Sequence, residues 1–151
     1  SLTNISNNDE ESAIGLVGSD SVSVTGNTVI NSQRGIYIYS SDYNIISGNE
    51  LSDNNSYGIY FTGSHYTVID SNIISDNNSY GIYLYQNCEY YEIANNTISN
   101  NNNGIYFYRY NHNGVIQHNT ISSNSSYGIY FEYYNYNFQI LNTSMRSIMG
   151  K

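Results

Sequence analysis

Side chains able to carry out acid–base chemistry are few in this chain of 151 residues, which has 12 acidic residues and 3 histidines. Cleavage of a sugar polymer needs two carboxyl groups that converge on one bond. The acids that could form such a pair are Asp70, Glu89 and Glu92. Their spacing in the sequence does not single out two that converge. Arg34 and Arg109, which would be needed to neutralise an acidic sugar, lie three repeats apart. We therefore expect that the chain is not an enzyme and assign no catalytic residue.

Metal ligands and nucleophiles are equally sparse. His112 and His118 lie six residues apart, His65 stands apart from both, and Cys88 is the one cysteine. A zinc or copper site needs several such ligands around one ion, and a disulfide needs a second cysteine. We therefore predict no transition-metal site and no disulfide within the chain.

The composition excludes several classes of protein. The net charge of −8, with only 4 lysine and arginine residues, disfavours nucleic acid as a partner. No apolar run approaches the roughly 20 residues that cross a bilayer, so we expect no membrane span. Disorder is disfavoured because the chain has 19 tyrosines and no proline.

A repeated unit, Gly-apolar-Tyr-apolar, organises the sequence. It starts at Gly35, Gly58, Gly81, Gly104 and Gly128, in steps of 23, 23, 23 and 24 residues, with a weaker copy at Gly15. A second unit, such as Asn-Thr-Ile-Ser, follows each glycine by about 14 residues. A nearly constant period of this length indicates one structural unit stacked several times.

Three short alternating segments fit within each period. In the period that starts at Gly58 they contain Ile59, Ile69 and Ile74, with Gly, Asn, Ser and Asp between them. Three strands and three turns make one rung of a solenoid, in which like residues stack about 4.8 Å apart. The sequence therefore predicts an all-β, right-handed parallel β-helix of about six rungs of about 23 residues, with three short strands per rung. Leucine-rich and helical repeats are disfavoured, because the residues they need are missing.

We expect a single domain over residues 1–151. Residues 1–14 form a partial first rung, residues 15–142 the regular rungs, and residues 143–151 a tail that contacts a neighbouring subunit. The chain begins and ends in nearly the same phase of the repeat, and no capping helix is evident. Because open strand edges accept another chain, this arrangement predicts head-to-tail stacking of identical subunits into a filament.

The repeated phrases also resemble a known family. Asn-Thr-Ile-Ser, an Asn-rich turn and then Gly-Ile-Tyr-Leu/Phe are similar to the parallel β-helix repeats of periplasmic copper-binding maturation proteins and of carbohydrate-binding or sugar-hydrolysing surface proteins. The resemblance runs from Thr3 to about Asn142 and implies an archaeal or bacterial surface protein. Because the matching residues build rungs, it implies the fold more than a function, and copper binding is not expected.

Stacking turns each repeated turn residue into a column. One column is predicted to contain Asn27, Asn49, Asn72, Asn96, Asn119 and Asn142, and another Ser32, Asn54, Asn77, Asn101 and Asn124. We interpret both as hydrogen-bonded ladders that stabilise turns. Asp53 and Asp76 also share a column, where solvated aspartates are favoured over a calcium site, and no other cofactor is expected.

Six Asn-x-Ser/Thr sequons are candidate N-glycosylation sites: Asn4, Asn54, Asn77, Asn95, Asn124 and Asn142. Three of them recur at one turn position, so we expect their side chains outside the solenoid and glycans projecting from one edge. Chance is the alternative in a chain so rich in Asn and Ser.

Tyrosines form the last set of columns. Tyr37, Tyr60, Tyr83, Tyr106 and Tyr130 alternate with inward apolar residues, so they are predicted to line one outer face as a candidate interaction face. Such a face serves sheet stability, a subunit contact or sugar binding.

These features favour an extracellular, cell-surface structural protein that stacks on copies of itself into a filament or sheath-like layer and carries N-glycans. The alternative is a carbohydrate-binding surface module from a larger β-helix protein. A polysaccharide-cleaving enzyme is the least favoured interpretation.

Overall fold

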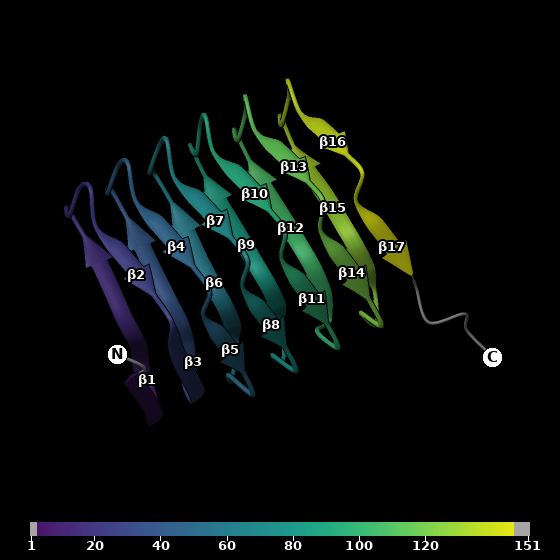
Figure 1. The fold of residues 1–151 in the computed structure, drawn as a ribbon. Coiled ribbons are helices and arrows are strands. Elements are labelled where there is room, and N and C mark those ends of the chain that lie inside the picture. Colours follow the sequence, from purple (N-terminus) through teal and green to yellow (C-terminus); the bar gives the residue numbers. More distant parts are fainter. Residues whose placement is uncertain (1–2, 147–151) are drawn as a thin grey trace.

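The computed structural model describes residues 3–146, with side chains from residue 11 onward, as a stack of strands (Figure 1). The described residues form 17 strands that pair only in parallel with the rung before and the rung after. In these residues no helix is long and apolar enough to cross a membrane. The predicted parallel β-helix is confirmed.

The strands define three sides of the solenoid. The first side, which we call the tyrosine sheet, contains β6 (Tyr57–Thr62), β9 (Tyr80–Gln86), β12 (Asn103–Arg109) and β15 (Tyr127–Tyr133). The second contains β2 (Ser23–Thr25), β4 (Ile45–Ser47), β7 (Val68–Asp70), β10 (Glu92–Ala94), β13 (Val115–Gln117) and β16 (Gln139–Leu141). The third contains β5 (Glu50–Ser52), β8 (Ile73–Ser75), β11 (Thr97–Ser99), β14 (Thr120–Ser122) and β17 (Ser144–Arg146). The long strands β1 (Thr3–Val17) and β3 (Asn27–Tyr39) run through the third side into the first, joining both into one 11-stranded sheet.

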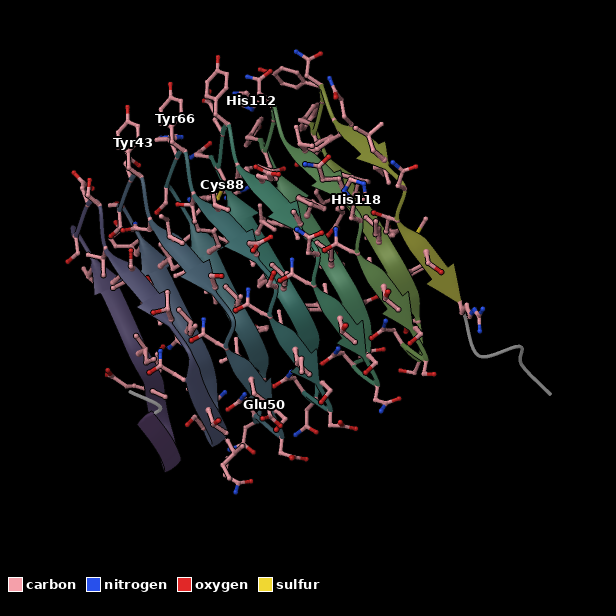
Figure 2. All side chains as sticks on the ribbon, in the orientation of Figure 1. Tyr43, Glu50, Tyr66, Cys88, His112 and His118 are labelled. Atoms are coloured by element: carbon pink, nitrogen blue, oxygen red, sulfur yellow. The ribbon has the colours of Figure 1, made fainter. Side chains whose placement is uncertain are left out.

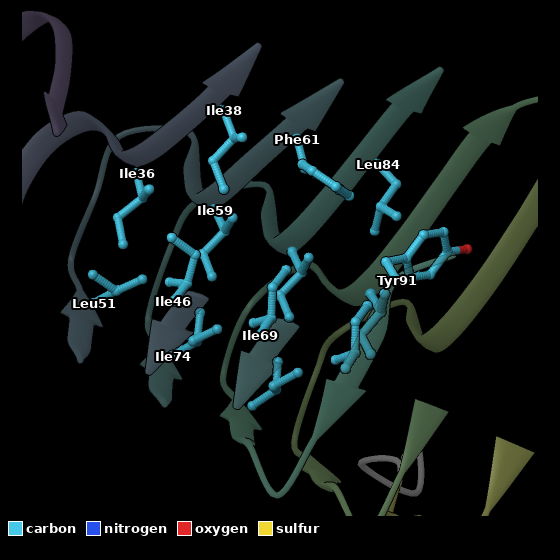
Figure 3. Packing of buried hydrophobic residues seen from close by; sticks show 14 of the residues in the cluster. Ile36, Ile38, Ile46, Leu51, Ile59, Phe61, Ile69, Ile74, Leu84 and Tyr91 are labelled. Atoms are coloured by element: carbon cyan, nitrogen blue, oxygen red, sulfur yellow. The ribbon is translucent and has the colours of Figure 1, made fainter. Parts of the chain in front are cut away.

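Like residues stack in register on every side. On the tyrosine sheet the inward positions pair as Ile36, Ile59, Ile82, Ile105 and Ile129. On the third side they pair as Val29, Leu51, Ile74, Ile98, Ile121 and Met145. These columns form the core, in which the isoleucines of the inner rungs are fully buried (Figure 3).

Close approaches inside this stack require glycine at two kinds of position. A Cβ on Gly81 would lie 2.7 Å from the Gly104 carbonyl oxygen, so the repeated glycine lets neighbouring rungs pack. A Cβ on Gly114 would lie 2.4 Å from the ring of Tyr91, which points into the core (Figure 3). The Tyr91 hydroxyl is buried there without a hydrogen-bond partner.

Asparagine ladders replace the strand hydrogen bonds at two of the three corners. Asn96 Oδ1 accepts from the backbone N–H and the Nδ2 of Asn72 at 2.9 and 3.0 Å. Asn96 Nδ2 donates to the Ile69 carbonyl at 2.9 Å and to Asn119 Oδ1 at 3.0 Å. Each amide thus satisfies buried backbone groups of one rung and links it to the next, as predicted.

The prediction that Asn142 belongs to the ladder of Asn72, Asn96 and Asn119 is wrong. Thr143, not Asn142, follows Asn119, because β14 pairs with β17 in the register Thr120 to Ser144. The Asn119 N–H reaches Thr143 Oγ1 at 3.5 Å, and Asn142 lies exposed beside it.

The third corner carries a ladder that the sequence analysis missed. The Ser41 N–H donates to Ser64 Oγ at 3.0 Å, and the Asn111 N–H donates to Asn135 Oδ1 at 3.0 Å. Serine starts this column and asparagine ends it, so no single residue type repeats. This mixture hides the ladder from a search for identical residues.

We predict that Asn96→Ala lowers the free energy of unfolding by about 3 kcal/mol, because it leaves a buried N–H and a buried carbonyl without partners. Urea denaturation measures the change. Thr97→Ala, an exposed substitution on the adjacent strand residue, is the control and costs less than about 1 kcal/mol. Equal losses in the two variants would contradict the ladder's role.

Candidate binding face: the tyrosine sheet

The predicted tyrosine column is confirmed as a column. Strands β3, β6, β9, β12 and β15 pair so that Tyr37, Tyr60, Tyr83, Tyr106 and Tyr130 are direct neighbours. All five side chains lie on the outside and are half-buried by one another rather than by the core. The same alternation that buries Ile59 and Phe61 turns Tyr60 outward.

Further tyrosines widen this face on both sides. Tyr57 and Tyr80 stack with ring centroids 5.6 Å apart, and Tyr85 and Tyr108 stack at 5.2 Å. Within each of these two flanking pairs the ring planes are therefore nearly parallel. In the central column the ring planes of Tyr83 lie 76° from those of Tyr60 and 73° from those of Tyr106, so these rings do not cover one another face to face. The face offers both ring surfaces and hydroxyl groups.

Charged residues are few on this face, and each is held against tyrosine. The Arg34 guanidinium lies 4.9 Å from the Tyr37 ring centroid, and that of Arg109 lies 5.2 Å from the Tyr108 centroid. Both contacts have cation–π geometry. The Tyr106 hydroxyl donates a hydrogen bond to the Glu132 carboxylate. The face is thus mostly uncharged.

Burial keeps the central phenols neutral. It raises the pKa of Tyr60 to about 12, with Tyr37 and Tyr57 adding to the effect. Burial raises the pKa of Tyr83 further and also raises that of Tyr106, where the hydrogen bond to Glu132 adds to the effect. Neutral phenols both donate and accept hydrogen bonds, but they do not act as bases near neutral pH.

The acids singled out in the sequence are each engaged separately. Glu89 pairs with His112 at 2.8 Å. Asp70 accepts hydrogen bonds from Ser71 and Asn95, and Glu92 accepts one from the Gln117 side chain. None of them lies on the tyrosine sheet.

His65, Cys88 and His112 lie in the corner between the first and second sides on three successive rungs, and His118 lies at another corner. Among the described residues no three His, Cys, Asp or Glu side chains are placed to hold a metal ion. Cys88 is buried, and this burial raises the pKa of its thiol to about 12, so the thiolate that attacks electrophiles is disfavoured. Asp53 and Asp76 are exposed in left-handed turn conformations.

The expectation that the repeated sequons face outward is wrong. Asn54, Asn77 and Asn124 are 0%, 1% and 4% exposed and belong to the second asparagine ladder. Asn77 Nδ2, the atom that would carry a glycan, donates to Asn101 Oδ1 at 3.0 Å. These three side chains are therefore not accessible in the folded chain.

The remaining sequons differ from one another. Asn95 and Asn142 are exposed, so glycosylation there stays a prediction. Asn4 lies in a part of β1 for which only the backbone is described.

We predict that the tyrosine sheet makes the fold sensitive to alkali. An unfolded tyrosine ionises near pH 10.0 and folded Tyr60 near pH 12, so the unfolded chain loses its proton first. The stabilisation is therefore complete below pH 10 and is lost as the pH rises through 12.

Urea midpoints measured across this range test the prediction, and Tyr60→Phe should show a smaller alkaline loss than the wild type. Tyr134→Phe, which removes a ring that is 71% exposed, is the control. An identical alkaline loss in the wild type and Tyr60→Phe would contradict the prediction.

Comparison with known proteins identifies the fold family. A family model described as a right-handed β-helix region matches residues 2–145. No curated protein matches the sequence closely enough to show a relative. Among solved structures, the crystal structure of the periplasmic alginate epimerase AlgG is similar, with a TM-score of 0.71 at 16% identity. The match covers 95% of this chain and 42% of that one. A mutant of the same enzyme matches with a TM-score of 0.71 at 17% identity over the same shares of the two chains.

This chain thus spans less than half the length of the epimerase, and the low identity supports a shared fold alone. The family match, by contrast, covers nearly every rung. The chain belongs to the right-handed parallel β-helix family.

Proposed function

We propose that this chain is a non-catalytic, extracellular carbohydrate-binding module that binds an extended, uncharged polysaccharide along its tyrosine sheet. The observation that carries the proposal is the contiguous outer column of tyrosines on five successive rungs. An apolar but hydroxylated face of this kind is typical of a binding surface.

The spacing of the column suits a polymer. One tyrosine recurs per rung, and the ring centroids of successive central tyrosines lie 5.2 to 5.6 Å apart. An extended glycan presents sugar units at a comparable spacing. The tilt between successive central rings leaves ring surfaces for the apolar side of a sugar. The phenol hydroxyls supply hydrogen bonds to its polar edge.

Charge favours a neutral ligand over an acidic one. The chain carries a net charge of −8, and the cations on the tyrosine sheet, Arg34 and Arg109, are separated by three rungs. Alginate, on which the structurally similar epimerase acts by its name, is a polyanion and would be repelled. Sharing the fold therefore does not carry that ligand over.

The arrangement of acids supports binding without turnover. Glu132 is engaged by Tyr106, and Asp70, Glu89 and Glu92 lie on other sides with their own partners. An inverting or retaining sugar hydrolase needs two free carboxyl groups across one bond.

We predict that Tyr60→Ala combined with Tyr83→Ala weakens binding to a soluble neutral β-glucan about tenfold or more, because two central rings are lost. Affinity electrophoresis in gels containing the glucan measures the retardation, and circular dichroism checks the fold. Tyr66→Ala combined with Tyr90→Ala removes two exposed turn tyrosines and is the matched control.

Unchanged retardation of the Tyr60/Tyr83 variant would contradict binding at this face. Stronger retardation of the wild type in alginate than in neutral glucan would contradict the choice of ligand.

A second candidate function is end-to-end assembly into a filament or surface layer. It is favoured by the apolar side chains of the last described rung: Ile140 is 43% exposed and Met145 is 52% exposed. Their counterparts one rung earlier, Ile116 and Ile121, are buried. A following rung from a second copy, or from further chain, would bury them.

If copies stack through this rung, sedimentation velocity will show species that lengthen with protein concentration, and Met145→Lys will shift them to monomers by placing a charge in the contact. A monomeric wild type at high concentration would exclude assembly of this chain alone.

A further inference from the structure

Three exposed tyrosines form a second aromatic feature away from the tyrosine sheet. Tyr43, Tyr66 and Tyr90, here called the tyrosine stack, occupy the same corner position on three successive rungs, between the first and second sides. Their ring centroids lie 4.8 and 5.1 Å apart, and both interplanar angles are 4°. Figure 2 shows Tyr43 and Tyr66 side by side at this edge, with their rings pointing away from the ribbon.

The turn itself does not require tyrosine at this corner. All three residues have a left-handed backbone, with φ between 52° and 58°, which is unfavourable for a bulky side chain. Asn113 and Asn137 occupy the same corner on the next two rungs with φ of 57°. Asparagine adopts the left-handed conformation at a lower cost in free energy than tyrosine does. The fold therefore accepts asparagine at this corner position and does not require tyrosine there.

The stack does not serve the core either. Tyr43, Tyr66 and Tyr90 are 58%, 44% and 51% exposed. Strained, exposed and repeated residues of this kind point to a role outside folding.

We propose that the tyrosine stack is a site of oxidative phenol coupling, which joins successive rungs of one chain through dityrosine. The oxidant is a peroxidase acting with hydrogen peroxide. Each of two neighbouring phenols gives up one electron and one proton, so that two phenoxyl radicals form and hydrogen peroxide is reduced to two water molecules. The radicals then join through a new carbon–carbon bond between ring positions ortho to the hydroxyls. Loss of the two ortho hydrogens as protons, taken up again by the two oxygens, restores both phenols.

The geometry favours coupling within one chain. The Tyr43 N–H donates to the His65 carbonyl and the Tyr66 N–H donates to the Glu89 carbonyl, both at 3.0 Å, so the backbones stay at rung spacing. Equal backbone conformations and parallel rings place the same ring edges next to each other. Neighbouring radicals therefore meet at a far higher effective concentration than radicals on two molecules.

Other exposed tyrosines show whether coupling needs two stacked phenols or only a large number of tyrosines. Tyr110 and Tyr134 lie in the same corner, three residues before Asn113 and Asn137. Their rings stack at 5.4 Å and 7°, are exposed, and should couple as well. Tyr136 is 54% exposed but stacks on His112 instead of a phenol, so it has no coupling partner in this arrangement.

The experiment treats the dilute chain with horseradish peroxidase and hydrogen peroxide and then cleaves it after glutamate. Cleavage after Glu50 and Glu89 places Tyr43, Tyr66 and Tyr90 on three different peptides, so a link between any two of them joins two peptides. Fragmentation of each linked pair then identifies which tyrosines are bonded. We expect monomeric product that has lost two hydrogen atoms per link, dityrosine fluorescence, and linked peptides that join Tyr66 to Tyr43 or Tyr90.

Tyr66→Phe removes the central phenol and leaves Tyr43 and Tyr90 two rungs apart, so the yield of links that fragmentation assigns to the tyrosine stack should fall about tenfold or more. Tyr136→Phe removes a phenol that is 54% exposed, against 44% for Tyr66, and should leave that yield unchanged. The proposal is overturned if links join only different chains, if Tyr66→Phe keeps the wild-type yield, or if the three tyrosines are oxidised without coupling. Circular dichroism of both variants keeps a folding defect distinguishable from a loss of coupling.

Discussion

Hydrogen bonding between successive rungs is the constraint on which the rest of this structure depends. Each inner strand pairs in parallel with the rung before and the rung after, so a residue type repeated at the period must stack on itself. At the corners the strand ladder is interrupted, and buried amides such as Asn72 and Asn96 take over the same task. The corners can therefore turn sharply without leaving backbone groups unpaired in the core.

The same constraint creates the outer surfaces. Because Ile59 and Phe61 must face inward, Tyr60 must face outward, and its neighbours on other rungs are also tyrosines. Stacked phenols bury one another, which raises the pKa of Tyr60 and keeps the face neutral. A chain with little charge on this side thereby gains a broad surface without a large electrostatic field.

The sequence predicts strands well and corners poorly. Alternation decides that Ile59 and Phe61 are buried and that Tyr60 faces outward, and the period decides what they pair with, so the fold and the tyrosine column followed from spacing. At a corner, side-chain direction depends on backbone conformation instead. Asp53 is left-handed, with φ of 54°, and the side chain of the next residue, Asn54, points inward, whereas its sequon was predicted to lie outside. The repeat identified the position but contained no information on φ.

Corner residues also explain how the solenoid tolerates irregular spacing. Phe61 pairs with Leu84 after 23 residues, but His65 bridges to Glu89 after 24. One extra residue is therefore accommodated around Gln86, where strand β9 ends and the corner begins. The Gln86 side chain accepts two hydrogen bonds from Arg109 on the next rung. Strand register is unaffected, because every inward column resumes on the following strand. The irregular spacing is thus accommodated at a strand end, next to the corner that carries the tyrosine stack.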